Sequence, residues 1–309
     1  MLSGSATGEV LRECRFLRSG WRLSDRRARP GRVHYNGPLE RGGSLTEAPD
    51  QLGEPDTEGT VLVSVAIPAY NEETCIGDCL RSLGRQRTSA RIEVVLCLNA
   101  CTDGTARVAS RVARRERLDL KLVDEPLKGI ARARQRAFQH ARGDIVLSAD
   151  ADSRYPSDWV ERIVTAFSRS PKPSLVYGPV HFSKIGGFGG WILNRVYPVL
   201  DFAITQFDRI GGQPNVWGPN FAVTREAFQK VGGFVGMKGF EDSQLAYRVA
   251  QTFGRRSLRY DRHLIVHASA RRYEVNGLLR GALYYFNCRF QMFVLKRDIP
   301  EFQDVRISS

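Results

Sequence analysis

The feature that most constrains the fold is a regular alternation of short apolar runs with amphipathic segments between residues 61 and 149. The apolar runs predict strands over residues 61–67, 92–98, 118–123 and 145–149, and Pro68 is expected to end the first of them. The intervening segments predict helices over residues 72–83, from residue 102 onward and over 129–141. Strands that alternate with helices of about this length are typical of β-α-β units. The sequence therefore predicts an α/β fold with a mostly parallel sheet.

The amino-terminal residues 1–58 have a different composition. They are rich in Gly, Ser, Arg and Pro, and their nine Arg balance nine Asp and Glu. Apolar residues are too sparse there to form a core, so we expect a poorly ordered arm. The formal net charge of +13 therefore arises from residues 59–309. Such a charge favours an anionic partner, which can be a nucleoside diphosphate, a nucleic acid or an anionic membrane surface.

Membrane-spanning and secretory signals are not predicted. No run of about 18 apolar residues occurs, and the first thirty residues carry many Arg and no apolar core run. We therefore expect a cytoplasmic protein, with peripheral contact at the inner face of a membrane left open. Two aromatic and apolar segments bear on that contact, residues 186–207 and 277–296. Residues 186–207 form either an amphipathic helix packed on the core or an apolar groove or interfacial surface for a lipid-linked or aromatic acceptor. Residues 277–296 are aromatic and basic, and the alternative to core packing for them is a terminal helix that lies on an anionic membrane.

Polar residues follow three of the predicted strands. They are Tyr70 to Glu72, Asn99, and the pair Asp150 and Asp152. Ligands of parallel sheets bind outside the carboxyl ends of the strands, so these residues are candidates for a site. On an extended segment the two aspartates project to the same side, close enough to share a divalent cation. Most D-x-D sequences are solvated turns, but the position after a buried strand favours Mg²⁺ or Mn²⁺ binding.

Further candidates lie near the carboxyl terminus. Glu241 and Asp242 open a predicted helix, where acids either cap the helix or supply a general base, and both readings can hold. His267 follows an apolar run and is either a core or edge residue or a metal ligand. Arg271 and Arg272 either serve a diphosphate or face solvent.

An ordered set of segments runs through roughly residues 61–272. The segments are 63–72 (VSVAIPAYNE), 101–105 (CTDGT), 128–135 (KGIARARQ), 141–145 (ARGDI), 150–152 (DAD), 218–222 (GPNFA), 231–234 (VGGF) and 241–242 (ED). Taken together, and more specifically than any one of them, these segments resemble the family 2 glycosyltransferases, which are inverting enzymes of the GT-A fold.

The resemblance implies a donor site for a nucleotide sugar, with a UDP-sugar favoured and a GDP-sugar possible. Its members here are Pro68, Tyr70 and Glu72 at the nucleoside, Asn99 at the base, Lys128 and Arg134 from the third segment, and Asp150 near the ribose and donor sugar. Many family members have Asp where this chain has Asn99, which makes a uracil preference less secure. Gln135 replaces a frequent Asn.

The resemblance also implies the catalytic and metal-binding groups. Asp242 would be the catalytic base, and Asp152 would bind Mn²⁺ or Mg²⁺. A histidine after the last core strand completes the metal site in several members, which makes His267 a metal ligand here. The acceptor would be a hydroxyl of a sugar, a lipid-linked molecule or another compound, and no nucleic acid is expected as a partner.

The same resemblance gives the domain organisation. Residues 59–275 would form the GT-A catalytic domain, with helices on both faces of its sheet. Residues 59–153 would bind the nucleotide sugar and residues 154–275 the acceptor. Outside the resemblance, the aromatic and basic pattern of residues 277–296 predicts a carboxyl-terminal amphipathic helix and tail over residues 276–309.

Three other functions compete with glycosyl transfer. A nucleotidyltransferase of the same fold usually has a Gly-rich, basic loop directly after its first strand, and Ala69 to Glu72 contain neither Gly nor a basic residue. A nucleic-acid-binding module leaves both acidic segments unexplained. A scaffold that binds a sugar nucleotide without transferring the sugar stays compatible with the sequence.

Overall fold

The computed structural model describes residues 60–183, 214–234 and 240–271, together with six further positions between 195 and 206. The strands in this part of the chain are β1 (Leu62–Ala69), β2 (Arg91–Asn99), β3 (Asp119–Glu125), β4 (Ile145–Ser148), β5 (Leu175–Tyr177), β6 (Val180–Ser183), β7 (Phe221–Thr224), β8 (Leu258–Tyr260) and β9 (Val266–Ser269). The helices are α1 (Ile76–Gly84), α2 (Thr105–Glu116), α3 (Ile130–Gln139), α4 (Trp159–Phe167), α7 (Arg225–Lys230) and α8 (Glu241–Phe253), with a short 3₁₀ turn, η2 (Arg255–Ser257).

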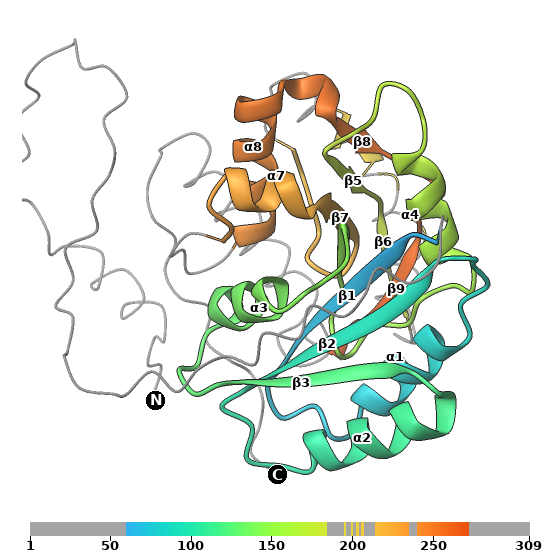
Figure 1. Ribbon diagram of the computed structural model, residues 1–309, viewed down its shortest axis with the longest axis vertical. Coiled ribbons are helices and arrows are strands. Elements are labelled where there is room, and N and C mark those ends of the chain that lie inside the picture. Colours follow the sequence, from blue (N-terminus) through green and yellow to red (C-terminus); the bar gives the residue numbers. More distant parts are fainter. Residues whose placement is uncertain are drawn as a thin grey trace, which may run out of the picture. The chain divides into compact units, whose positions relative to one another are not determined.

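The main sheet of the described residues has seven strands in the order β3-β2-β1-β4-β7-β5-β8 (Figure 1). β1 pairs in parallel with both β2 and β4, and β2 pairs in parallel with β3. β7 runs antiparallel to both β4 and β5, and β5 is parallel to β8. A second, parallel sheet consists of β6 and β9. The predicted α/β fold with a mostly parallel sheet is therefore confirmed.

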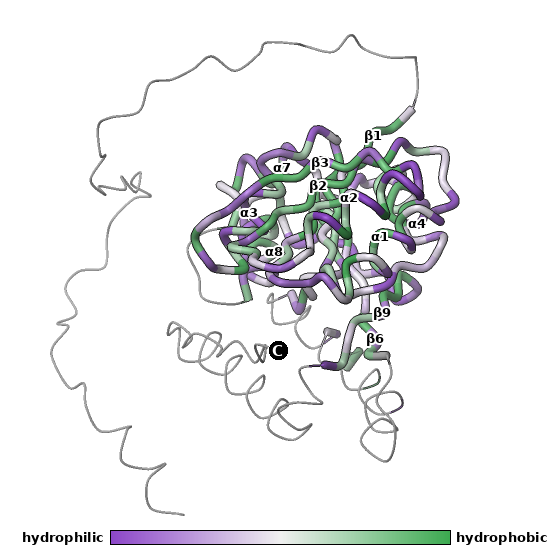
Figure 2. Tube along the Cα trace, turned by 90° about the horizontal axis from the view of Figure 1, so that it is seen from below, coloured by the Kyte–Doolittle hydropathy of each residue, from purple (hydrophilic) through white to green (hydrophobic). Residues whose placement is uncertain are grey.

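Successive side chains of the central strands pack on opposite faces of the sheet. Val63, Val65 and Ile67 of β1 lie in one cluster with residues of α1, α2 and α4, whereas Ala66 lies in a second cluster with residues of α3, α7 and α8. The two-residue period of a strand requires this alternation. Figure 1 shows α1 and α2 on the opposite side of the sheet from α3. Figure 2 shows hydrophobic and hydrophilic residues interleaved along α1 and α2, as expected for helices with one face on the sheet.

Two predicted boundaries differ from the structure. β1 does not end at Pro68 but continues to Ala69. The carbonyl of Ala66 accepts a hydrogen bond from the Ala149 N–H, so residues 66 and 68 turn their backbone polar groups toward β4. Pairing between β1 and β4 ends at Ala66, so the missing N–H of Pro68 removes no hydrogen bond from the sheet. The first helix begins at Ile76 rather than at Glu72 because the intervening residues form the turn described below.

Several predictions fall on residues that the structure does not describe. These are the arm over residues 1–58, the terminal segment over 276–309, and most of the apolar segment 186–207. Among the described residues, no helix has both the length and the apolar character needed to cross a membrane.

A buried carboxylate connects the first two strands to the loop before β4. Glu93 on β2 is 1% exposed, and its carboxylate accepts hydrogen bonds from the hydroxyl of Ser64 and from the backbone and side chain of Arg142. The same Ser64 hydroxyl accepts a hydrogen bond of 2.7 Å from the Gly143 N–H. Burial alone would raise the pKa of Glu93, but these hydrogen bonds together outweigh burial and hold the pKa below its usual value.

Replacing Glu93 with Gln should destabilise the protein at neutral pH by about 1–3 kcal/mol, because hydrogen bonds to a buried charge are lost. The folded-state pKa lies below the unfolded value of about 4.3, so the stabilisation is complete above that value and is lost as the pH falls through the folded-state pKa. Urea unfolding curves of wild type and Glu93→Gln should differ most near pH 7 and converge at acidic pH. The exposed Glu226→Gln serves as control, and a pH-independent difference for Glu93→Gln would contradict this role.

Candidate functional site

The turns that follow β1 and β2 are held together by hydrogen bonds between side chains of the first turn and backbone N–H groups of the second. The Asn71 side chain accepts from the Thr102 N–H at 2.9 Å, and the Glu73 carboxylate accepts from the Gly104 N–H at 2.7 Å. Asn71 and Ala100 both have positive φ, 51° and 49°, a conformation that costs a non-glycine residue roughly 1–2 kcal/mol. Strained backbone of this kind is concentrated at functional sites, and both residues lie at the carboxyl ends of parallel strands.

The candidate base-binding residue Asn99 makes three hydrogen bonds to the backbone. Its side chain is buried, and its amide N–H groups donate to the carbonyls of Glu125 and Leu127 at 3.0 and 2.8 Å. Its carbonyl oxygen accepts from the Gly129 N–H at 2.8 Å. Asn99 therefore fixes the loop between β3 and α3, which carries Lys128.

Two further candidates for the donor site are brought together by that loop. The Lys128 Nζ lies 4.1 Å from the centroid of the Tyr70 ring, within cation–π range. Tyr70 directly follows β1, whose last residues are Pro68 and Ala69. The structure thus places a cation and an aromatic face at the carboxyl end of β1, although they are 58 residues apart in the sequence.

A second group of candidates surrounds Arg134, which is 2% exposed on α3. Its Nη2 donates to Asp150 Oδ1 at 2.7 Å, and its Nη1 donates to Glu241 Oε1 at 2.8 Å. The same Nη1 lies 4.0 Å from Asp242 Oδ2. One guanidinium therefore joins the first aspartate after β4 to both acids at the start of α8.

Asp242 is positioned by the unusual start of α8. The N-cap residue is Phe240, with a positive φ of 57° and no side-chain capping hydrogen bond, and Asp242 is the second residue of the helix. Burial, reinforced by the charge of Glu241, raises the pKa of Asp242 to about 7, although Arg134 and the Ser243 N–H act in the opposite direction. A carboxylate with this pKa can take up a proton near neutral pH, which a general base requires.

The second aspartate after β4 belongs to a different ion pair. Arg271 Nη2 lies 3.0 and 3.1 Å from the two carboxylate oxygens of the buried Glu72, and 3.6 Å from Asp152 Oδ2. Burial alone would lower the pKa of Arg271, but the charge and hydrogen bonds of Glu72 raise it above its usual value. Asp150 and Asp152 are therefore held by two different arginines.

The expectation that Asp150 and Asp152 lie on an extended segment is wrong. The Ser153 N–H donates to the Asp150 carbonyl at 3.1 Å, which closes a turn over Ala151 and Asp152. The Asp150 N–H donates to the hydroxyl of the buried Tyr155 at 2.8 Å. β4 ends at Ser148. The hydrogen bonds just described hold the residues that follow in a turn and not in an extended conformation.

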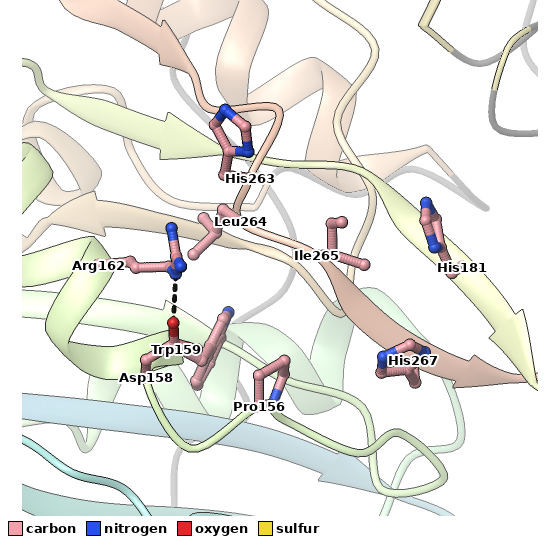
Figure 3. Close-up of a pocket in the computed structure, with 9 residues that line it drawn as sticks. All are labelled: Pro156, Asp158, Trp159, Arg162, His181, His263, Leu264, Ile265 and His267. Carbon is pink, nitrogen blue, oxygen red and sulfur yellow. Dashed lines mark hydrogen bonds and ion pairs between the residues drawn. The ribbon is translucent and has the colours of Figure 1, made fainter.

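His267 lines a pocket of about 270 Å³ together with residues of α4, β6 and the segment before β9 (Figure 3). Its ring lies opposite that of His181 on the paired strand, with ring centroids 6.2 Å apart. The pKa of His181 is lowered mainly by burial and further by the charge of His267. Arg162 is paired with Asp158 in the same pocket. Backbone hydrogen bonds between His267 and Arg154 join this pocket to the segment that follows Asp152.

The described residues do not contain a preformed metal site of three or more His, Cys, Asp or Glu side chains. Asp150, Asp152 and His267 therefore do not converge on a common point in this structure. The carboxylate oxygens of the two aspartates are nevertheless ligands of the kind that Mg²⁺ and Mn²⁺ prefer. A metal of this kind that is bound together with a diphosphate needs only one or two carboxylates from the protein.

Three residues organise the site through contacts that the sequence does not predict. Arg271 is brought to Glu72 and Asp152 only by the fold. Asn220 is fully buried and accepts a hydrogen bond from Trp159 Nε1 at 3.0 Å, while its own amide donates to two backbone carbonyls. Gln135 accepts a hydrogen bond from the Phe234 N–H at 2.7 Å, which gives the departure from the family pattern a structural role. The sequence singles out Arg271, Gln135 and the segment 218–222, which contains Asn220, but it does not show these contacts.

Curated relatives are described as glycosyltransferases. An uncharacterized glycosyltransferase of Haemophilus influenzae is 22% identical over 194 residues, which are 62% of this chain and 62% of the relative. Glycosyltransferase AglE of Haloferax volcanii is 32% identical over 128 residues, or 41% of each chain. This chain thus spans less than two thirds of the length of these relatives.

Solved structures share the fold. The mannosyltransferase PcManGT of Pyrobaculum calidifontis, solved in complex with GDP-Man and Mn²⁺, has a TM-score of 0.59 at 24% identity, over 79% of this chain and 67% of that one. TarS of S. aureus, solved in complex with UDP-GlcNAc, has a TM-score of 0.50 at 16% identity, over 68% of this chain and 58% of that one. At these identities the likeness shows the fold, which is that of the GT-A glycosyltransferases.

The model of the family described as Glycosyl transferase family 2 matches residues 64–232. The matched region contains the turns after β1 and β2, Arg134, and both aspartates after β4. Glu241, Asp242 and Arg271 lie beyond it and are joined to it by the ion pairs described above. Because the match covers more than half of the chain, this protein belongs to glycosyl transferase family 2.

Proposed function

We propose that this protein transfers a sugar from a nucleoside diphosphate sugar to an acceptor hydroxyl with inversion, and that Asp242 is the general base. The observation that carries the proposal is the cluster around Arg134, in which a partly buried carboxylate with a pKa of about 7 shares a guanidinium with the first aspartate after β4. A base with a pKa near the working pH combines the correct protonation state with enough basicity to accept a proton.

The donor would occupy the carboxyl ends of β1, β2 and β4. Pro68, Tyr70 and Glu72 would line the nucleoside pocket, with Lys128 beside Tyr70. Asn99 would contact the base of the nucleotide and would also position Lys128, because it holds the loop between β3 and α3. A UDP-sugar or a GDP-sugar fits this proposal, and the GDP-Man and UDP-GlcNAc complexes of the two structural neighbours support the donor class.

Asp150 and Asp152 would lie at the sugar and the diphosphate. A bound Mn²⁺ or Mg²⁺ supplies positive charge that stabilises the departing diphosphate. Asp152 would hold the metal, with His267 as a second ligand. The Mn²⁺ in the PcManGT complex supports a metal in this role. Arg271, which lies within 3.6 Å of Asp152, would add a further positive charge at the diphosphate.

The reaction would be a single displacement. Asp242 takes the proton of the acceptor hydroxyl as the acceptor oxygen forms a bond to the anomeric carbon. The bond between that carbon and the diphosphate oxygen breaks on the opposite face of the sugar, and its electron pair leaves with the nucleoside diphosphate. The protein needs no nucleophile of its own, so one carboxylate base is sufficient.

Asp242→Asn should lower turnover by about 10² or more, the usual contribution of general-base catalysis, with little effect on donor affinity. A thermal-shift panel of UDP-, GDP- and dTDP-sugars with Mn²⁺ identifies the donor, and release of nucleoside diphosphate measures transfer. Asp144→Asn, at an exposed position, serves as control. If Asp242 only stabilised the helix, Asn would replace it without loss, so normal transfer by Asp242→Asn would refute the assignment.

Asp152→Ala should weaken binding of the nucleoside diphosphate by tenfold or more in the presence of Mn²⁺, because the diphosphate would lose the metal that offsets its charge. EDTA should weaken binding by wild type to a similar degree and should have little further effect on Asp152→Ala. Calorimetric titration with UDP and GDP measures these affinities, with Asp119→Ala as the control. Equal affinity of wild type with Mn²⁺, wild type with EDTA and the variant would exclude the proposed metal site.

A further inference from the structure

The guanidinium of Arg134 connects two parts of the protein that are distant in sequence. Arg134 lies on α3, 16 residues before Asp150 and 107 residues before Glu241. Three carboxylates lie within 4.0 Å of it, those of Asp150, Glu241 and Asp242. Carboxylates gathered in a partly buried position repel one another and lose hydration, and a shared cation offsets both costs.

We propose that Arg134 is a positioning residue, which holds Glu241 and Asp242 against Asp150 and so sets where the general base lies relative to the donor. The inference rests on the proposed role of Asp242 as the base. It goes beyond that role because it assigns Arg134 to the base and not only to the donor. Both Nη atoms are used, one toward each group of acids, so the forked shape of the guanidinium matters as well as its charge.

The surroundings of Arg134 show that this position is built to hold a guanidinium closely. A Cβ added to Gly218 would lie 2.6 Å from both Nη1 and Nη2 of Arg134, which is shorter than real Cβ contacts. The φ of Gly218 lies outside the left-handed region, so its backbone conformation does not by itself require glycine. Glycine is therefore needed at this position to admit the guanidinium.

The backbone beneath the guanidinium cannot readily move away. Two residues after Gly218, the fully buried Asn220 donates to the carbonyls of Pro179 and Leu264 at 2.8 and 2.6 Å. It also accepts a hydrogen bond from Trp159. A larger side chain at position 218 would consequently displace the Arg134 guanidinium rather than the loop.

Electrostatics give the position of Arg134 a measurable consequence. The charged groups that act on Asp242 are Glu241 on α8 and Asp150 after β4, which raise its pKa, and Arg134 on α3, which lowers it. The backbone N–H of Ser243 also lowers it. Removing or displacing the guanidinium should thus raise the pKa of Asp242 above its value of about 7, because repulsion from the two other carboxylates remains.

The test is a carboxyl titration of Asp242 by NMR in protein labelled with ¹³C at aspartate Cγ, with the signal assigned by its loss in Asp242→Asn. Arg134→Met removes the charge but retains an unbranched side chain, and its midpoint should rise by about one pH unit or more. Gly218→Ala, which removes no charged group, should raise the midpoint in the same direction. The matched controls are Arg136→Met, at an exposed position of the same helix, and Gly77→Ala, where a Cβ meets the flexible end of Arg81 and lies in ordinary van der Waals contact with Val108. Both controls should titrate like wild type.

Arg134→Lys separates charge from shape. A lysine retains the positive charge but cannot bind both groups of acids in a fork. The titration midpoint should stay within about half a unit of wild type, while turnover with the identified donor should fall by about tenfold or more, since a displaced base loses alignment. A merely structural role predicts that any loss of activity follows loss of folding, which near-UV circular dichroism measures.

An unchanged midpoint in folded Arg134→Met would overturn the proposal. If Arg134→Met does not fold, Gly218→Ala decides: a midpoint and turnover equal to those of Gly77→Ala would overturn it, and a raised midpoint with lower turnover would support it. The titration requires no substrate, so its outcome is independent of the proposed function. Normal transfer by Asp242→Asn would instead refute Asp242 as the general base, while the effect of Arg134 on the pKa of Asp242 would still stand.

Discussion

Carboxylates at the ends of parallel strands can be partly buried only where cations neutralise them, and two arginines meet this requirement here. Arg134 joins Asp150 to Glu241, and Arg271 joins Glu72 to Asp152. Leaving such a carboxylate buried without its partner typically costs several kcal/mol. Arg134 precedes β4 in the chain, and Arg271 lies after β9. The turn after β4 is bound to both arginines, through Asp150 and Asp152. The arrangement of the candidate site therefore depends on these two ion pairs.

The position of β4 in the sheet explains why the ion pairs meet there. β4 pairs in parallel with β1 on one side and antiparallel with β7 on the other. It is thus the strand at which the parallel part of the sheet meets the part that contains β7 and β5. The residues that directly follow β4 can contact groups from both parts, as Asp150 does through Arg134. Changes of strand order or direction are where open α/β sheets bind ligands.

The central elements could be predicted from the sequence because their apolar periodicity is local. The strands and helices between residues 61 and 149 are present, with ends shifted by a few residues. The extension of β1 past Pro68 could not be predicted, because it depends on where pairing with β4 ends. The turn over Asp150 and Asp152 also depends on tertiary structure, since the hydroxyl of Tyr155 binds the Asp150 N–H.

The candidate residues could likewise be selected from the sequence, whereas their pairing could not. Motif order identifies Arg134, Asp150 and Asp242, but nothing in it shows that one guanidinium contacts all three carboxylates of the cluster. His267 and Arg271 are four residues apart, and sequence reasoning favoured the histidine for the site. In the folded chain it is Arg271 that lies beside Asp152, because its ion pair with the buried Glu72 fixes its direction.

The start of α8 bears on the two readings of Asp242, as a residue that stabilises the helix start and as a general base. An acid that serves as a helix cap occupies the N-cap position and accepts a hydrogen bond from the second or third helical N–H. Here the N-cap is Phe240, and Asp242 instead accepts from the N–H of its neighbour Ser243. Phe240 adopts a strained positive φ at the point where the chain enters the helix and carries Glu241 and Asp242 toward Arg134. A Ser, Thr or Asp at the N-cap would stabilise the helix more than Phe240 does. The strained backbone at this N-cap therefore supports a role for Asp242 in the site beyond stabilising the helix.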